Sequence, residues 1–289
     1  MMRRFAQAAW AALVLLLPLT ARAQPVRVEV PSLDAPGGTP VLLGGHWFAA
    51  PGSAPTPAMV LLHGCGGAFD GRGRLGERYT EMAARLNELG VHALVTDSFG
   101  PRHEKQICTQ RVRQRRIDQS QRRRDALGAL QWLAARPDVD ARRIGLLGWS
   151  NGGSTVLAAI NLRHREVAAA PVRPSLAVAF YPGCEAEHDR GFEASAPLLM
   201  QLGEADDWTP AAPCKALAAA VRQGPLPQWD AYEGAHHGFD GSAPLRHRAD
   251  VPNGLKPGQG VHVGANPVAR DAAAARLASF IRETWRLSP

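Results

Sequence analysis

The chain has 289 residues, of which 45% are hydrophobic and 20% are charged, and its formal net charge is +7 at pH 7. This is enough apolar sequence for one large core, so we expect a single domain over residues 24–289. The 29 glycines and 23 prolines are scattered along the chain, which excludes a low-complexity or repeat protein.

The first 23 residues predict an export signal. Arg3 and Arg4 give a positive start, residues 8–17 are apolar, and Ala21-Arg22-Ala23 is a cleavage site of the A-x-A type. The alternative is an uncleaved membrane anchor, but the apolar stretch is too short to span a bilayer. We therefore expect a periplasmic or secreted protein that has no stable membrane association after cleavage.

Segments with strand and helix patterns alternate along the rest of the chain. The first two predicted strands, at 26–30 and 41–47, look like edge strands that are separated by a Pro/Gly turn. The other predicted strands are 58–62, 91–96, 143–147, 176–180, 198–202 and 228–232, and the predicted helices are 75–89, 121–135, 152–162, 211–222 and 267–285.

This alternation predicts an α/β fold. Strands that alternate with helices of about 10–15 residues imply right-handed crossovers and a mainly parallel sheet with helices on both faces. In such a sheet the ligand site lies at the carboxyl ends of the strands. Each candidate catalytic residue named below follows a predicted strand.

Seven arginines gather between Arg111 and Arg124. No aromatic residues alternate with them and no nucleic-acid-binding motif accompanies them, so we expect no nucleic-acid partner. We interpret this segment as a solvated loop and helix face.

Four cysteines in an exported chain suggest two disulfides. Free thiols are the alternative, and a set of four allows three pairings. The residues are Cys65, Cys108, Cys184 and Cys214.

The sequence Gly148-Trp149-Ser150-Asn151-Gly152 matches G-x-S-x-G and lies between a predicted strand and a predicted helix. A sharp turn there exposes the serine in a strained conformation and requires small residues on both sides. The five letters alone are weak evidence, because a glycine-rich turn with a capping serine fits them too. The strand–turn–helix context favours Ser150 as a nucleophile.

A serine hydroxyl needs a base to take its proton, and the imidazole base needs a carboxylate to fix its tautomer. After Ser150, two successive predicted strands run into an acidic loop and a histidine loop. The order serine, acid, histidine along the chain is the one expected for a serine nucleophile at a strand–turn–helix motif. We expect Asp206 to be the acid, with Asp207 as the alternative. We expect His237 to be the base and His236 to be a neighbour that packs against the site.

The loop His63-Gly64-Cys65-Gly66-Gly67 follows the predicted strand 58–62. Hydrolysis of an acyl group needs two N–H donors for the oxyanion. We assign these donors to the main chain of Asn151, directly after the nucleophile, and of Cys65 in this loop. A simple glycine turn is the alternative, and we interpret His63 as structural.

Four parts of the sequence together resemble the dienelactone hydrolase family within the α/β-hydrolases. They are residues 63–67, 97–102 and 148–153, and the pair 203–210 with 232–239. The resemblance implies the α/β-hydrolase fold and a hydrolase without metal or cofactor. It assigns the nucleophile to Ser150, the acid to Asp206, the base to His237 and an oxyanion amide to Cys65.

Two positions depart from that family pattern. Enzymes that open dienelactones carry a cysteine where this chain has Ser150 and a glutamate where it has Gly64. A serine nucleophile favours a broader esterase. The resemblance also implies the pairs Cys65–Cys108 and Cys184–Cys214, on loops after strands expected to be neighbours.

The leading hypothesis is therefore hydrolysis of small carboxylic esters or lactones through an acyl-serine intermediate. A peptidase of the prolyl-oligopeptidase type, whose catalytic domain shares the acidic and histidine loops, is the second hypothesis. A non-catalytic binding protein on the same fold is the third, and the presence of all three triad residues argues against it. The Pro/Gly-rich residues 242–264 are expected to be irregular, and they either overhang the site or form a long connection.

Overall fold

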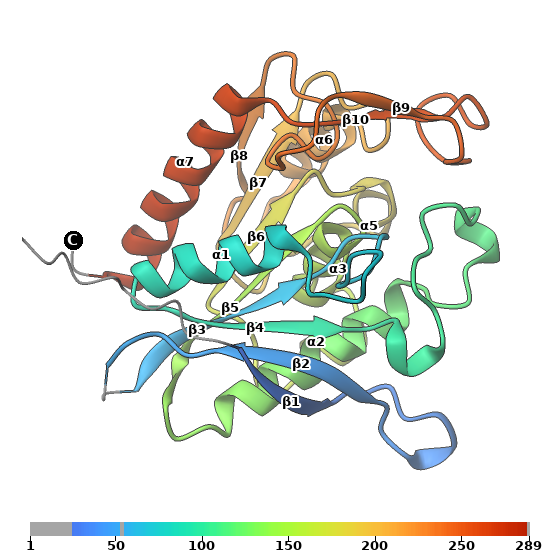
Figure 1. Ribbon diagram of the computed structural model, residues 1–289. Coiled ribbons are helices and arrows are strands. Elements are labelled where there is room, and N and C mark those ends of the chain that lie inside the picture. Colours follow the sequence, from blue (N-terminus) through green and yellow to red (C-terminus); the bar gives the residue numbers. More distant parts are fainter. Residues whose placement is uncertain (1–24, 53–54, 288–289) are drawn as a thin grey trace, which may run out of the picture.

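The computed structural model describes residues 25–52 and 55–287, in which an eight-stranded sheet has the order β1-β2-β4-β3-β5-β6-β7-β8 (Figure 1). The predicted export signal at residues 1–23 lies outside this part. The strands of the sheet are β1 (Val26–Pro31), β2 (Leu42–Phe48), β3 (Thr56–Leu62), β4 (His92–Asp97), β5 (Val139–Trp149), β6 (Leu176–Phe180), β7 (Leu198–Gly203) and β8 (Gln228–Tyr232).

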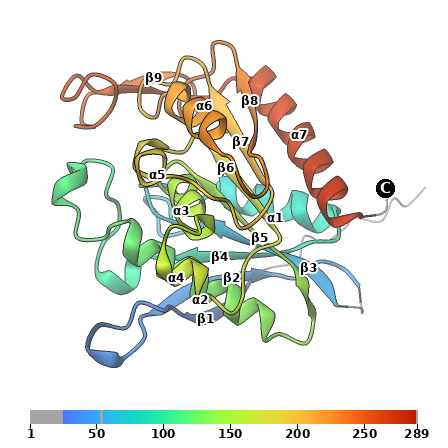
Figure 2. The ribbon, with the colours of Figure 1, turned by 180° about the vertical axis from the view of Figure 1, so that it is seen from behind.

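All strand pairs from β4 to β8 are parallel, whereas β2 runs antiparallel to both β1 and β4. Helices cover both faces of this sheet, as Figures 1 and 2 show from opposite sides. The predicted α/β-hydrolase fold is thereby confirmed. The helices are α1 (Glu77–Glu88), α2 (Gln119–Ala134), α3 (Asn151–Ile160), α4 (Arg165–Ala168), α5 (Glu185–Arg190), α6 (Ala211–Ala220) and α7 (Pro267–Trp285), with 3₁₀ turns at Pro36–Gly38, Gly100–Arg102 and Val112–Gln114.

The two faces of the sheet form two hydrophobic clusters. Val60 and Leu62 of β3 pack in the cluster that includes α2, α3 and α6, whereas Met59 and Leu61 pack in the cluster that includes α1 and α7. Successive residues of a strand point to opposite faces, so a strand between two helical layers is apolar at every position. This is why β3 appears in the sequence as an unbroken apolar run.

Two expectations about secondary structure were wrong. The strand β2 is not an edge strand, because it lies between β1 and β4. An edge strand and the strand beside it can share the same alternation of polar and apolar residues, so the sequence does not distinguish them. Residues 242–264 are not wholly irregular, because β9 (Arg246–Arg248) and β10 (Val261–Val263) form an antiparallel pair. Strands of three residues are too short to show a periodicity.

The segment rich in arginine is only partly solvated, which corrects the expectation of a solvated helix face. Arg111 and Arg113 are exposed, but Arg122 and Arg123 of α2 are buried. Arg123 pairs with Glu166, and Arg122 contacts main-chain and amide oxygens near the predicted nucleophile. A periodicity of hydrophobic residues carries no signal for a buried charged side chain with polar partners.

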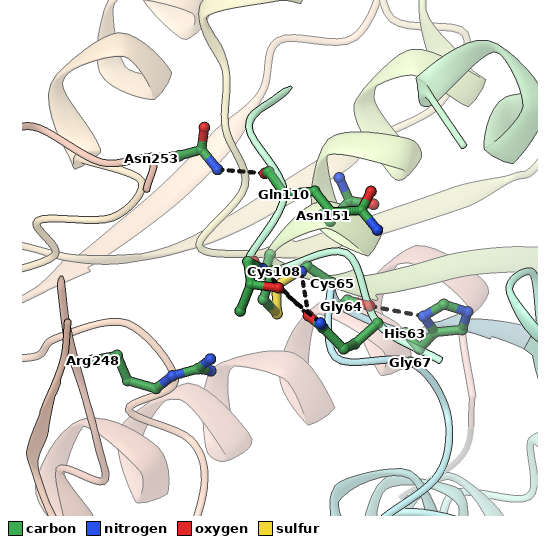
Figure 3. The surroundings of a disulfide bond; sticks show 12 residues. His63, Gly64, Cys65, Gly67, Cys108, Gln110, Asn151, Arg248 and Asn253 are labelled. Atoms are coloured by element: carbon green, nitrogen blue, oxygen red, sulfur yellow. Dashed lines mark hydrogen bonds between the residues drawn. A yellow bond between two sulfur atoms is a disulfide. The ribbon is translucent and has the colours of Figure 1, made fainter. Parts of the chain in front are cut away.

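Both implied disulfides are present. Cys65–Cys108 joins the loops after β3 and β4 (Figure 3), and Cys184–Cys214 joins the start of α5 to α6. Cys214 thus lies in a helix and not in a loop. Two disulfides are compatible with an oxidising compartment. Among the helices within 25–52 and 55–287, none has the length and apolar character needed to cross a membrane.

Candidate active site

Ser150 lies at the turn between β5 and α3 with φ of 53° and ψ of −119°. A positive φ in a residue other than glycine is strained and is found at functional sites. The flanking glycines make the turn possible: a Cβ atom on Gly148 would lie 2.3 Å from the carbonyl oxygen of Gly152, and one on Gly152 would lie 2.1 Å from that of Leu62. The geometry agrees with the strained strand–helix turn expected from the sequence.

The side chains of Ser150, His237 and Asp206 form a continuous chain of hydrogen bonds. The Nε2 atom of His237 lies 2.9 Å from the Ser150 Oγ atom, and its Nδ1 atom lies 2.8 Å from Asp206 Oδ2. The exposed fractions are 9% for Ser150 and 4% for each of the other two residues. Three residues from three separate loops at the carboxyl ends of strands therefore meet, as the sequence predicted.

The main chain of its own loop holds Asp206. Its Oδ1 atom accepts hydrogen bonds from the N–H groups of Trp208 at 2.8 Å and Thr209 at 2.9 Å. The Thr209 hydroxyl is also 3.1 Å from Asp206 Oδ2 and 3.0 Å from His237 Nδ1. These contacts hold the Asp206 carboxylate in place beside the imidazole of His237.

The two alternative residues, Asp207 and His236, lie outside this chain of hydrogen bonds. The Asp207 carboxylate instead accepts hydrogen bonds from the main-chain N–H of His262 at 2.8 Å and from its ring Nδ1 at 2.7 Å. Partial burial raises the pKa of Asp207, but the hydrogen bonds from His262 outweigh it and leave this pKa below its usual value. The geometry thus separates Asp206, which the spacing in the sequence favoured, from Asp207, which it left as the alternative.

Two aromatic rings pack against the imidazole of His237. The ring centroid of Tyr181 lies 4.6 Å from that of His237, and the centroid of Trp208 lies 4.5 Å away. Tyr181 directly follows β6 and has a positive φ of 37°. The sequence analysis missed Tyr181 and Thr209, although the position of Tyr181 directly after β6 and that of Thr209 in the acidic loop were usable signals.

The loop with Gly64 and Cys65 lies against the nucleophile. A Cβ atom built on Gly64 would lie 3.6 Å from the Cβ atom of Ser150. Asn151 is the first residue of α3, and the first N–H groups of a helix have no acceptor within the helix. Figure 3 shows Gly64, Cys65 and Asn151 on neighbouring segments of this region.

His63 joins this loop to the segment after β4. Its Nδ1–H donates to the carbonyl oxygen of Gly64 at 2.8 Å, and its Nε2 atom accepts from the main-chain N–H of Ser98 at 3.1 Å. Burial, helped by the charge of Arg122, holds the pKa of His63 well below 6.5. The ring is therefore neutral, and it plays the structural role expected from the sequence.

Arg122 was missed as a site residue. Only 1% of it is exposed, and its guanidinium donates to the carbonyl oxygen of His63 at 2.7 Å and to the side-chain oxygen of Asn151. Burial lowers the pKa of Arg122 to about 10. One buried cation thus contacts both segments that carry the expected oxyanion donors.

Asp240 organises the inner side of the nucleophile turn. It accepts hydrogen bonds from the indole N–H of Trp149 at 2.7 Å and from the hydroxyl of Tyr181 at 2.6 Å. Arg78 pairs with the same carboxylate at 3.1 Å. The residue before Ser150 and the ring beside His237 are therefore held by one acid.

The parallel sheet, the strained serine at a strand–helix turn and the loops around it define an α/β-hydrolase. More specifically, the sequence profile of the dienelactone hydrolase family matches residues 45–284, so the chain belongs to that family. Membership makes it a hydrolase that acts on ester bonds. A search of curated protein sequences found no match.

Solved structures with the same fold share little sequence with the chain. The dienelactone hydrolase-like promiscuous phosphotriesterase P91 from metagenomic libraries has a TM-score of 0.65 and 19% identity, over 91% of this chain and 99% of that one. Esterase 2 of Thermogutta terrifontis, phosphorylated by paraoxon, has a TM-score of 0.60 and 17% identity, over 95% and 100%. A puromycin-hydrolyzing peptidase of Mycobacterium tuberculosis has a TM-score of 0.62 and 19% identity, over 95% of this chain but 41% of that one.

Proposed function

We propose that the protein hydrolyses small carboxylic esters or lactones through an acyl-serine intermediate. In this proposal Ser150 is the nucleophile, His237 the general base and acid, and Asp206 the carboxylate that orients the imidazole. The observation that supports it most directly is the chain of hydrogen bonds at 2.9 Å and 2.8 Å from Ser150 through His237 to Asp206.

In the first half of the reaction, the Ser150 oxygen attacks the acyl carbon while His237 Nε2 takes the hydroxyl proton. The carbon–oxygen bond to the leaving group then breaks, and His237 returns the proton to the departing alcohol. For a lactone the alcohol remains attached to the acyl group. In the second half, His237 deprotonates a water molecule that attacks the acyl-serine, and the Ser150 oxygen leaves with that proton.

The main-chain N–H groups of Cys65 and Asn151 are proposed to hold the oxyanion. Two observations support this role: the position of Gly64 against Ser150 and the place of Asn151 at the start of α3. The amino end of α3 adds a favourable partial positive charge near the developing anion. Removing one such donor typically costs about 3–4 kcal/mol of transition-state stabilisation.

Two positions, Ser150 in place of a cysteine and Gly64 in place of a glutamate, distinguish this chain from the enzymes that open dienelactones and favour a broader range of ester substrates. Gly64 contributes no carboxylate beside the nucleophile, and the group in contact with the Ser150 hydroxyl is the imidazole of His237, at 2.9 Å. We therefore place the physiological substrate among general esters and lactones. The predicted export signal and the two disulfides support a periplasmic or secreted enzyme.

The test is turnover of p-nitrophenyl acetate by the wild-type protein, Ser150→Ala and the exposed-serine control Ser242→Ala. Ser150→Ala should lose at least about 10⁴-fold in kcat, since removing a triad nucleophile removes covalent catalysis. Ser242→Ala should keep its activity. A fluorophosphonate should modify Ser150 in the wild type, located by peptide mass spectrometry. If the folded Ser150→Ala variant keeps most of its turnover, the proposal fails.

A substrate panel then separates the ester hypothesis from the peptidase hypothesis. Matched pairs should be compared, in which one acyl group is carried either on an ester or on a peptide-like amide, and lactones should be added to the panel. We expect esters and lactones to have the higher kcat/KM. A higher value for the amide of a peptide-like substrate would point to a peptidase instead.

A further inference from the structure

A second cluster of polar side chains lies directly beside the triad. Asp207, His236 and His262 each place one possible metal-ligand atom within 4.8 Å of those of the other two. Asp207 and His236 are the sequence neighbours of Asp206 and His237, but they lie outside the chain of hydrogen bonds that joins Ser150, His237 and Asp206. His262 comes from β10, in the long connection that precedes α7.

One member of the cluster lacks a hydrogen-bond partner. Within residues 25–52 and 55–287, His236 Nδ1 is buried and pairs with no other polar group. A buried polar atom of this kind costs free energy unless a ligand or solvent satisfies it. The ring centroid of His236 lies 5.5 Å from that of His262, whose own Nδ1 atom contacts Asp207. The unpaired nitrogen thus belongs to a ring that lies in the same cluster as the Asp207 carboxylate.

We propose that Asp207, His236 and His262 bind one Zn²⁺ ion, with solvent in the remaining position. Two imidazoles and a carboxylate are a ligand set that zinc takes with tetrahedral geometry. His247 stands beside His262, with ring centroids 5.1 Å apart, but its Nε2–H donates to the carbonyl oxygen of Gln259, so it remains outside the ligand set.

The three ligands lie outside the chain of hydrogen bonds of the triad, so we assign the ion the role of a cross-link and no part in the hydrolysis. Its three ligands come from the acidic loop, the histidine loop and β10, which the main chain already joins: Leu255 N–H donates to Asp207 O, and Gly264 N–H donates to His237 O. A bound ion would add a further cross-link to these main-chain hydrogen bonds. It departs from the expectation of no metal that the family resemblance implied.

The binding test uses the wild-type protein without a polyhistidine tag, after treatment with EDTA. Isothermal titration with ZnCl₂ should show about one high-affinity site per chain, and ZnCl₂ should raise the melting temperature by several degrees, because a ligand stabilises the state that binds it. His262→Gln and Asp207→Asn should weaken the affinity at least about tenfold and remove the thermal shift. His188→Gln, at an exposed histidine outside the cluster, should behave as the wild type.

Zinc affinity and thermal shift unchanged in folded His262→Gln would overturn the proposal, as would wild-type protein that does not bind zinc. Anomalous diffraction from zinc-soaked wild-type crystals locates the ion even if a variant does not fold. A peak between the three side chains supports the proposal, and a peak only elsewhere overturns it. Because zinc binding is measured without a substrate, this result is independent of the outcome for Ser150.

Discussion

The guanidinium of Arg122 donates a hydrogen bond to the side-chain oxygen of Asn151, the residue directly after the proposed nucleophile. Its second amino group donates to the carbonyl oxygen of His63, at the start of the opposite loop. The relative position of the two proposed oxyanion donors therefore depends on one buried side chain of α2. Arg122 touches no reacting atom and acts through these two segments.

Arg122→Met should lower kcat at least about tenfold with a smaller change in KM. Oxyanion donors act mainly on the transition state, so their displacement weakens transition-state stabilisation more than it weakens substrate binding. Arg122→Lys should recover part of the loss, since an ammonium reaches one of the two acceptors. The matched control is Arg123→Met, on the same helix, which breaks the contact with Glu166 and should reduce stability but not kcat. Equal kcat losses in both Met variants would contradict a positioning role for Arg122.

Asp206→Asn and Asp207→Asn test which carboxylate orients the imidazole. An amide at residue 206 would donate to His237 Nδ1 and favour the wrong tautomer, so kcat should fall by about 10⁴-fold. Asp207→Asn should cost less than about tenfold in kcat, because the Asp207 carboxylate contacts His262 and not His237. The ester assay measures both, and a larger loss for Asp207→Asn would reverse the assignment.

The two disulfides should differ in their effect on activity. In the chain-entropy model, removing either bridge costs about 3–4 kcal/mol of unfolding free energy, because the closed loops differ little in length. The double variant Cys65→Ala/Cys108→Ala should also lower kcat, since this bridge anchors a proposed oxyanion donor and Ile107 N–H donates to Cys65 O at 2.8 Å. Cys184→Ala/Cys214→Ala should keep kcat in the folded state. Urea unfolding and ester turnover measure the two effects, and unchanged kcat in the first variant would contradict the link.

The alternation of strands and helices was predictable because each central strand is apolar on both faces, as β3 and β7 show. The turn at Ser150 was also predictable from its flanking glycines, since only small residues fit there. The choice between Asp206 and Asp207 was guided but not decided by their spacing in the acidic loop. It depends on which carboxylate the turn at Thr209 directs towards His237.

Long-range polar contacts were the part that sequence patterns did not reveal. Arg122 lies 59 residues from His63 and 29 from Asn151, so nothing local marks it as different from its exposed neighbours. The pair of Asp207 with His262, 55 residues apart, is equally invisible. A periodicity reports which face of a helix is buried, but it does not report which charged group has a partner on that face.

The neutral ring of His63 should make the stability of the protein sensitive to acid. Its pKa is lowered well below 6.5 by burial, whereas an unfolded histidine titrates near 6.5. As the pH falls below 6.5, the unfolded chain gains a proton that the folded chain does not, so the unfolding free energy decreases. This contribution to stability is present above the unfolded pKa and is lost on acidification. Between about pH 7.5 and about pH 5.5 the loss from one such residue is about 1.4 kcal/mol.

His63→Gln should therefore show a fall in unfolding free energy over this interval that is about 1.4 kcal/mol smaller than that of the wild type. Glutamine does not titrate, and its amide both donates and accepts, so it suits the contacts with Gly64 and Ser98. Urea unfolding at the two pH values measures the difference. In the control variant His188→Gln, at an exposed histidine, the unfolding free energy should decrease as much as in the wild type. An equal fall in His63→Gln and the wild type would mean that the ring takes up a proton in the folded protein, at the expense of the hydrogen bond from Ser98.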